Sequence, residues 1–141
     1  MKFLALLITF LMPFNAMSEN RSTLDNLSPL LWQNRIILVF STQPEHQKTI
    51  LEDAKAQIQD RDIVWFIIDG NQTITNYDGK VSNQFAATIS RQFSSIAEPV
   101  ILIGKDGGVK ETSDLLSLES LFDEIDSMPM RIREMQKKSS P

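Results

Sequence analysis

The only histidine of this 141-residue chain lies in a short polar segment, Ser41-Thr42-Gln43-Pro44-Glu45-His46. An imidazole beside two hydroxyl groups could act as a general base that activates Ser41 or Thr42 as a nucleophile. Together with the Glu45 carboxylate it could also supply part of a metal site. Catalysis requires that base, nucleophile and orienting group converge in space, and the spacing here forces no such convergence. A solvated histidine at the rim of a polar helix face is the simpler interpretation.

Cysteine is absent from the chain, which excludes disulfides, zinc–cysteine sites, iron–sulfur clusters and every reaction that needs a thiolate. One imidazole is also too few for a transition-metal centre, so we predict no metal and no cofactor. The formal net charge of -4 disfavours binding to the phosphate backbone of nucleic acids. The remaining partner classes are an unknown protein or a small ligand.

Two other charged or glycine-rich motifs have structural interpretations. The segment 104–108, Gly-Lys-Asp-Gly-Gly, lacks the spacing of a phosphate-binding loop and predicts a hairpin turn with Asp106-Gly107 at positive backbone angles. Five acidic residues surround the last predicted core helix: Asp114, Glu119, Asp123, Glu124 and Asp126. We interpret them as a solvated face, matched by the basic residues Arg131, Arg133, Lys137 and Lys138 of the C-terminal tail.

The N-terminus has the pattern of a secretory signal peptide over residues 1–18. Lys2 precedes an apolar run over residues 3–14, and Ala16-Met17-Ser18 supplies the small residues of a cleavage site. Twelve residues would rise about 18 Å as a helix, too little for a bilayer core of about 30 Å. We therefore expect a periplasmic or secreted protein with no transmembrane segment after signal removal. The remaining chain divides into a flexible lead-in (19–29), a folded domain (30–128) and a short basic C-terminal helix or tail (129–141).

Hydrophobic periodicity predicts alternating strands and helices in the folded domain. Residues 35–40 and 63–68 are continuous apolar runs, typical of strands that are buried on both faces. Between them a helix is expected, with Thr42 and Glu45 at capping-box spacing and its apolar stripe running to Ile58. The later predicted elements are a minor strand at 73–75, a helix over 81–96 behind Ser82, strands at 100–103 and 109–111, and a helix that begins after Ser117.

The resulting order, β-α-β-α-β-β-α, predicts an α/β fold with a central mixed sheet and helices on both faces. This is a thioredoxin-like arrangement, in which the segment 41–46 joins the first strand to the first helix. Pro99 precedes the third main strand, where that fold keeps a cis-proline, so we predict a cis Glu98–Pro99 bond. The candidate binding surface consists of the residues of this region: Ser41, Thr42, Gln43, Pro44, Glu45, His46, Glu98 and Pro99.

Three segments resemble one family in particular: WQNRIILVFS (32–41), ILIGKDGGVK (101–110) and LFDEIDSMPMRIREM (121–135). They are similar to a bacterial secreted domain of unknown function that is related to the P-DUDES domain of animal extracellular proteins and is described as peroxiredoxin-like. The resemblance implies the thioredoxin-like fold and export, but it brings no established reaction. Because the reactive cysteine of such folds would lie within 41–46, its absence separates this chain from thiol redox chemistry.

These observations favour an exported binding or interaction module without thiol redox activity. Two other hypotheses remain open at this point. One is a cysteine-free enzyme that uses the Thr42–His46 segment, and the other is a relative of oxidoreductases that has lost catalysis or only recognises thioredoxin-like proteins. A cluster of perturbed titratable groups at the segment would favour the enzyme, whereas an apolar patch would favour the binding module.

Overall fold

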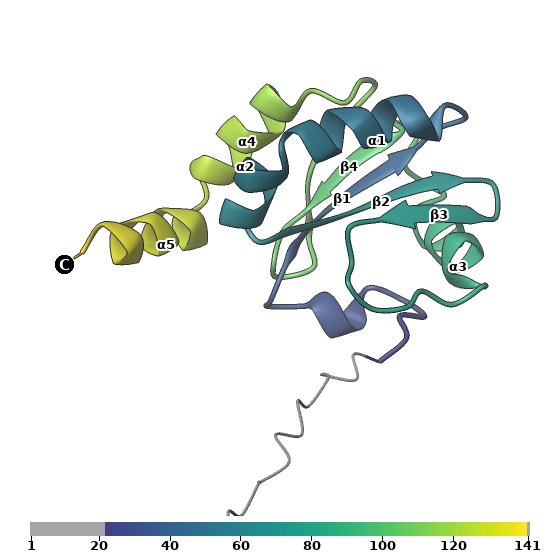
Figure 1. Cartoon of the computed structure of the whole chain (residues 1–141), viewed down its shortest axis with the longest axis horizontal. Coiled ribbons are helices and arrows are strands. Elements are labelled where there is room, and N and C mark those ends of the chain that lie inside the picture. The colour runs from purple at the N-terminus through teal and green to yellow at the C-terminus, as the bar shows by residue number, and fades with distance from the viewer. Residues whose placement is uncertain (1–21, 141) are drawn as a thin grey trace, which may run out of the picture.

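The computed structural model describes residues 22–140, so the predicted signal peptide lies outside the described residues. Figure 1 shows the arrangement of the helices and strands. In chain order they are the 3₁₀ helix η1 (Ser28–Leu30), β1 (Arg35–Phe40), α1 (Pro44–Asp53), α2 (Lys55–Asp60), β2 (Ile63–Asp69), β3 (Gln72–Thr75), α3 (Phe85–Gln92), β4 (Val100–Ile103), β5 (Val109–Ser113), α4 (Leu118–Asp126) and α5 (Pro129–Ser139).

The five strands form one mixed sheet in the order β3-β2-β1-β4-β5. β1 is parallel to β2 and antiparallel to β4, and the remaining pairs are antiparallel. The central position of β1 explains why its apolar run is continuous, since both faces of a central strand are covered. The predicted α/β fold with a central mixed sheet is thus confirmed, as is the antiparallel pairing of 100–103 with the strand that begins at Val109.

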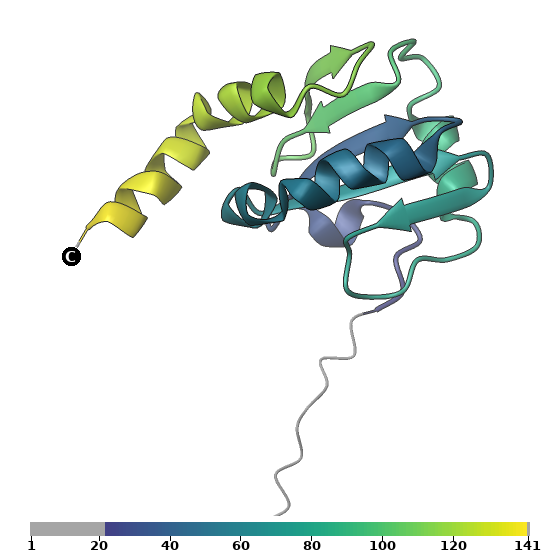
Figure 2. The same cartoon turned by 45° about the horizontal axis from the view of Figure 1, so that its top comes forward.

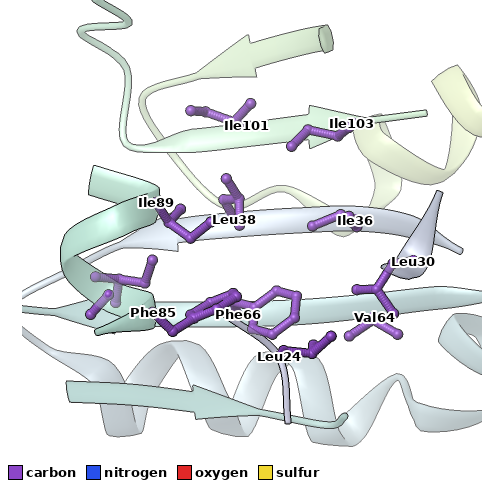
Figure 3. Close-up of a cluster of buried hydrophobic side chains, with 12 residues drawn as sticks. Leu24, Leu30, Ile36, Leu38, Val64, Phe66, Phe85, Ile89, Ile101 and Ile103 are labelled. Atoms are coloured by element: carbon purple, nitrogen blue, oxygen red, sulfur yellow. The ribbon is translucent and has the colours of Figure 1, made fainter. Parts of the chain in front are cut away.

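One face of the sheet is covered by α3 and by the segment that leads into β1 (Figures 1 and 3). Side chains at alternate positions of β1 and β2 point into this layer, where the Phe66 and Phe85 rings lie 4.8 Å apart. Its fully buried members include Leu24, Leu38, Phe66, Phe85, Ile89 and Ile101. Leu24 belongs to the segment predicted as a lead-in, but its backbone pairs with Val81 and its side chain has no exposed surface.

The opposite face is covered by α1, α2 and α4 (Figure 2). The other alternate positions of the strands contribute to this second layer, together with helix residues such as Leu51, Ile58, Leu121 and Ile125. Ser117 caps α4 as predicted, because its side-chain oxygen accepts a hydrogen bond from the Ser120 amide at 3.4 Å. Beyond α4, α5 is the last helix of the described residues (Figure 2), and its Arg131 and Glu134 form ion pairs with Asp60 and Arg35 of the domain.

Three local predictions are wrong. The helix predicted up to Ile58 is divided at Ala54 into α1 and α2. The N-cap of α1 is Gln43 without a side-chain cap, so Thr42 and Glu45 form no capping box; the Ser41 hydroxyl instead accepts from the Gln43 amide at 3.0 Å. The sequence between Val81 and Gln84 is not helical, and α3 begins only at Phe85.

The predicted cis bond before Pro99 is also wrong, because the described chain has no cis peptide bond. The trans form of an X-Pro bond is favoured by about 0.5–1 kcal/mol unless the surroundings select the cis form. Here the trans bond is compatible with the sheet, since the Pro99 carbonyl accepts a hydrogen bond from the Phe40 amide at 2.9 Å. The cis form is thus a feature of the thioredoxin-like fold that no contact of this chain requires.

Candidate functional site

The carboxyl end of β1 opens into a cleft of about 380 Å³. Its walls come from the end of β1, the start of α1, the start of β4 and the loop between β5 and α4. The lining residues are Val39, Phe40, Ser41, Thr42, Gln43, Gln47, Pro99, Val100, Asp114, Leu115 and Leu116. We call this region the junction cleft. At this end of the sheet, the chain passes from β1 to α1 on one face of the sheet. The neighbouring strand β4 is reached from α3, which covers the other face. Ligands of α/β folds often bind at such a position.

The junction cleft brings together half of the predicted binding surface. Ser41, Thr42, Gln43 and Pro99 line it, whereas Pro44, Glu45, His46 and Glu98 do not. Sequence reasoning missed two features of this cleft. The side-chain amide oxygen of Gln47, Oε1, is buried and has no hydrogen-bond partner, and Leu115 is 78% exposed in the β5–α4 loop. For the second feature, the available sequence signal was the pair Leu115-Leu116 between the last predicted strand and the predicted cap Ser117.

The geometry at the junction does not assemble a catalytic group. The His46 side chain is exposed and, within residues 22–140, makes no hydrogen bond or ion pair. The Ser41 hydroxyl is engaged with the Gln43 amide. A hydroxyl nucleophile needs an adjacent base within hydrogen-bond reach, and the imidazole does not occupy that place.

The opposite end of the sheet holds a network of ion pairs, which we call the charged end. Arg35 at the start of β1 is only 1% exposed and binds Glu134 of α5 with both terminal nitrogens, at 3.1 and 3.2 Å. Lys105 of the β4–β5 hairpin donates to the same Glu134 at 2.7 Å and to Asp62 at 2.9 Å. These contacts join β1, the β4–β5 hairpin and α5.

A second set of pairs holds α4, α5 and the end of α2 together. Arg131, 2% exposed, donates to Asp126 at 3.0 Å and to the Asp60 carboxylate at 2.6 Å. Arg61 binds both oxygens of Asp126, at 3.1 and 2.8 Å, and its guanidinium lies 4.3 Å from the centre of the Phe122 ring. Lys138 also donates to Asp60, at 2.7 Å. The predicted match between the acidic helix and the basic tail therefore holds for Arg131, whereas Lys138 reaches α2 instead.

These contacts shift the pKa values of the carboxyl groups. Hydrogen bonds from Lys138 and Arg131 lower the pKa of Asp60 to about 2, and Arg61 with Arg131 lowers the pKa of Asp126. Burial raises the pKa of Glu134, but hydrogen bonds from Arg35 and Lys105 outweigh it, so that its pKa is lowered. All three carboxylates are thereby held in the charged form at neutral pH.

Backbone strain is found at the charged end. Among residues 22–140, two non-glycine residues have positive φ, Trp32 at 64° and Asp62 at 52°. Aspartate tolerates this region, but for a tryptophan it costs about 1–2 kcal/mol. The Trp32 amide donates to the Lys105 carbonyl at 2.7 Å, which fixes the strained residue against the hairpin, and its side chain stays 62% exposed.

The hairpin itself follows the sequence prediction in part. Gly107 has φ of 82°, and a Cβ added there would lie 2.7 Å from the Leu31 side chain, so glycine serves both the turn and this close approach. Asp106 does not share the positive angle; its carboxylate accepts from the Gly108 amide and from Lys110. The Lys110 hydrogen bond, with that of Gly108, lowers the pKa of Asp106.

Over residues 22–140, no three histidine, cysteine or carboxylate side chains are grouped so that they could hold a metal ion. In the same part of the chain, no helix has the length and hydrophobicity needed to cross a membrane.

Fold and site together define a mixed α/β domain with no cysteine chemistry, a small cleft at one end of its sheet and an ion-pair network at the other. The chain belongs to the DUF4174 family, a domain of unknown function whose family model matches residues 26–134. No curated protein and no solved structure matches the chain.

Proposed function

We propose that this domain is an exported binding module that holds a protein or small ligand in the junction cleft, without thiol redox chemistry. The observation that carries the proposal is the buried, unpartnered side-chain oxygen Oε1 of Gln47, a residue that lines this cleft. A buried acceptor without a donor is costly, and a donor from a ligand would satisfy it. The resemblance to secreted thioredoxin-like and P-DUDES domains supports the same proposal.

The character of the cleft fits binding better than catalysis. Its polar groups are hydroxyls, amides and the single carboxylate of Asp114, and its rim carries the exposed Leu115. A small number of fixed polar groups beside apolar surface gives orientation and affinity to a bound partner. No specific observation favours the cysteine-free enzyme, since His46 lies outside the cleft.

Capture experiments with matched variants test the proposal. The mature domain, residues 19–141, is immobilised and exposed to the exported fraction of the cells that produce it. We expect a bound molecule that is recovered with wild-type protein and lost with Gln47→Leu and Leu115→Ser. Val109→Ser is the control, because Val109 is also an exposed aliphatic residue, 44% exposed, but does not line the cleft. Recovery that is unchanged in both cleft variants would contradict the proposed site.

Export is tested separately. The intact mass of the exported protein should correspond to a chain that begins near Glu19, because the cleavage motif ends at Ser18. A mature product that retains residues 1–14 would contradict secretion by a cleaved signal peptide.

A further inference from the structure

A second cavity, of about 510 Å³, lies at the charged end and is separate from the junction cleft. It is bounded by Trp32 and the start of β1, by the β4–β5 hairpin, and by residues of α4, of α5 and of the connection between them. The three sequence segments 32–41, 101–110 and 121–135 each contribute to its lining. Its volume is within the range of small-molecule sites, about 300–1,000 Å³.

Part of the lining of this cavity is apolar. Trp32 contributes to it from the segment before β1, and Met128, Pro129 and Met130 contribute from the connection between α4 and α5. The Trp32 backbone is strained, and its ring is nevertheless largely exposed. Strain at a bulky residue persists when the surroundings impose it and is concentrated at functional sites, so an exposed ring held in this way points to a bound partner.

The polar lining carries donors that the protein does not use fully. Arg35 is 1% exposed, and its Nε–H is buried without a hydrogen-bond partner, although its terminal nitrogens bind Glu134. Arg133 is exposed and forms no ion pair within residues 22–140. An anionic acceptor in the cavity would satisfy the first donor and neutralise the second charge.

We propose that this cavity binds a small amphipathic carboxylate, with a flat apolar body against Trp32 and the methionines and the carboxylate toward Arg35 and Arg133. Glu124 also lines the cavity and forms no ion pair within the described residues. Its negative charge repels a bound anion, so the proposal predicts opposite effects on carboxylate binding for the removal of Glu124 and of Arg133. Removing Glu124 should strengthen the binding of a carboxylate, whereas removing Arg133 should weaken it.

Titration of the mature domain with 2-naphthoate, followed by amide and indole NMR shifts, tests the site. We expect saturable shifts at the Trp32 indole N–H, at 104–106 and at 128–133. The neutral 2-naphthamide should bind more weakly, because it lacks the charge. Arg133→Gln should weaken 2-naphthoate binding and Glu124→Gln should strengthen it, each by roughly two- to fivefold, the range of one exposed charge contact.

Trp32→Gly separates a binding role from a structural one. Glycine adopts a φ of 64° without strain, and this relief opposes the larger conformational entropy that glycine gives the unfolded chain, so the variant should remain folded with little change in thermal stability. Loss of the ring should nevertheless weaken 2-naphthoate binding about tenfold. Arg91→Gln is the control, because Arg91 is an exposed arginine on α3 outside this cavity. Absence of saturable shifts, equal binding of acid and amide, or weaker binding in Glu124→Gln would each overturn the proposal.

Discussion

The junction cleft and the charged end lie at opposite ends of the same central strand, and they differ in the burial and pairing of their polar side chains. At the junction the polar groups are mostly exposed hydroxyls and amides, and His46 makes no ion pair within residues 22–140. At the charged end Arg35 and Arg131 are almost completely buried, and each binds carboxylates from another element. The first end is therefore open to a partner, whereas the second fastens α5 to the domain.

The comparison shows that the place where the fold predicts a site and the place where ion pairs are concentrated need not coincide. The resemblance to thioredoxin-like proteins in the sequence directs attention to the start of α1, where this chain has no cysteine. The carboxylates with lowered pKa, Asp60, Asp126 and Glu134, lie instead at the charged end. Titratable groups with shifted pKa values can belong to a functional site or to structural ion pairs. Here, members of the ion-pair network also line a cavity.

The largest effect is expected from Arg35→Ala. Removing the guanidinium leaves the partly buried Glu134 with Lys105 and a longer, 3.9 Å pair to Arg131, so we expect a loss of about 3 kcal/mol in the free energy of unfolding. Urea unfolding of the two proteins measures it. Lys48→Ala is the control, because Lys48 forms an exposed 3.9 Å pair with Glu52 on α1 and should matter by less than about 0.5 kcal/mol. If the two substitutions lowered the free energy of unfolding equally, the buried ion pairs of the charged end would not be stronger than an exposed pair, and the comparison would be contradicted.

Acidification should weaken the charged end. Because the pKa values of Asp60, Asp126 and Glu134 are lowered in the folded state, the unfolded chain binds more protons once the pH falls below their usual values of 3.8 and 4.5. Stability is thus fully present above about pH 5 and is lost as the pH falls through the lowered values, down to about 2 for Asp60.

Asp60→Asn sharpens this test. Asp60 is about half exposed, so solvent screening limits its contribution to roughly 1 kcal/mol at neutral pH. The variant should be less stable than the wild type at about pH 7, and the difference should shrink at about pH 2, where the wild-type carboxylate is also protonated. Unfolding curves at both pH values measure it, and a difference that is the same at both would contradict the assigned ion pairs.

The smallest effect is expected from His46→Ala. The exposed imidazole makes no ion pair or hydrogen bond within residues 22–140, so unfolding should change by less than about 0.5 kcal/mol. In an assay with peroxide and a thiol donor, neither protein should exceed the buffer blank, because both peroxidase and disulfide-exchange reactions require a cysteine. Turnover by the wild type that His46→Ala abolishes would favour the cysteine-free enzyme.

The sequence was sufficient for the sheet, and four of the eight residues predicted for the binding surface line the junction cleft. Continuous apolar runs such as 35–40 identify central strands, and their order along the chain limits the topology. Contacts between distant segments could not be read in this way. The pairing of Arg35 with Glu134 joins residues 99 positions apart, and each of them alone is an ordinary charged residue.

Local errors had local causes. Thr42 and Glu45 have the spacing of a capping box, but α1 begins one residue later, after Gln43. Leu24 was assigned to a polar lead-in because its neighbours are polar, whereas a single apolar residue there is enough to pack against the core. The strain at Trp32 leaves no trace in the sequence pattern, since tryptophan is not a residue that predicts positive φ.

Hydrogen exchange of the domain with its captured partner tests most directly the proposal that the junction cleft is the binding site. The full mature chain is compared with and without the molecule recovered from the exported fraction. Slower exchange is expected for amides of residues 41–47 and 114–116, which border the junction cleft, with no change at 104–110. Protection confined to the charged end, with residues 41–47 unaffected, would contradict the proposed function.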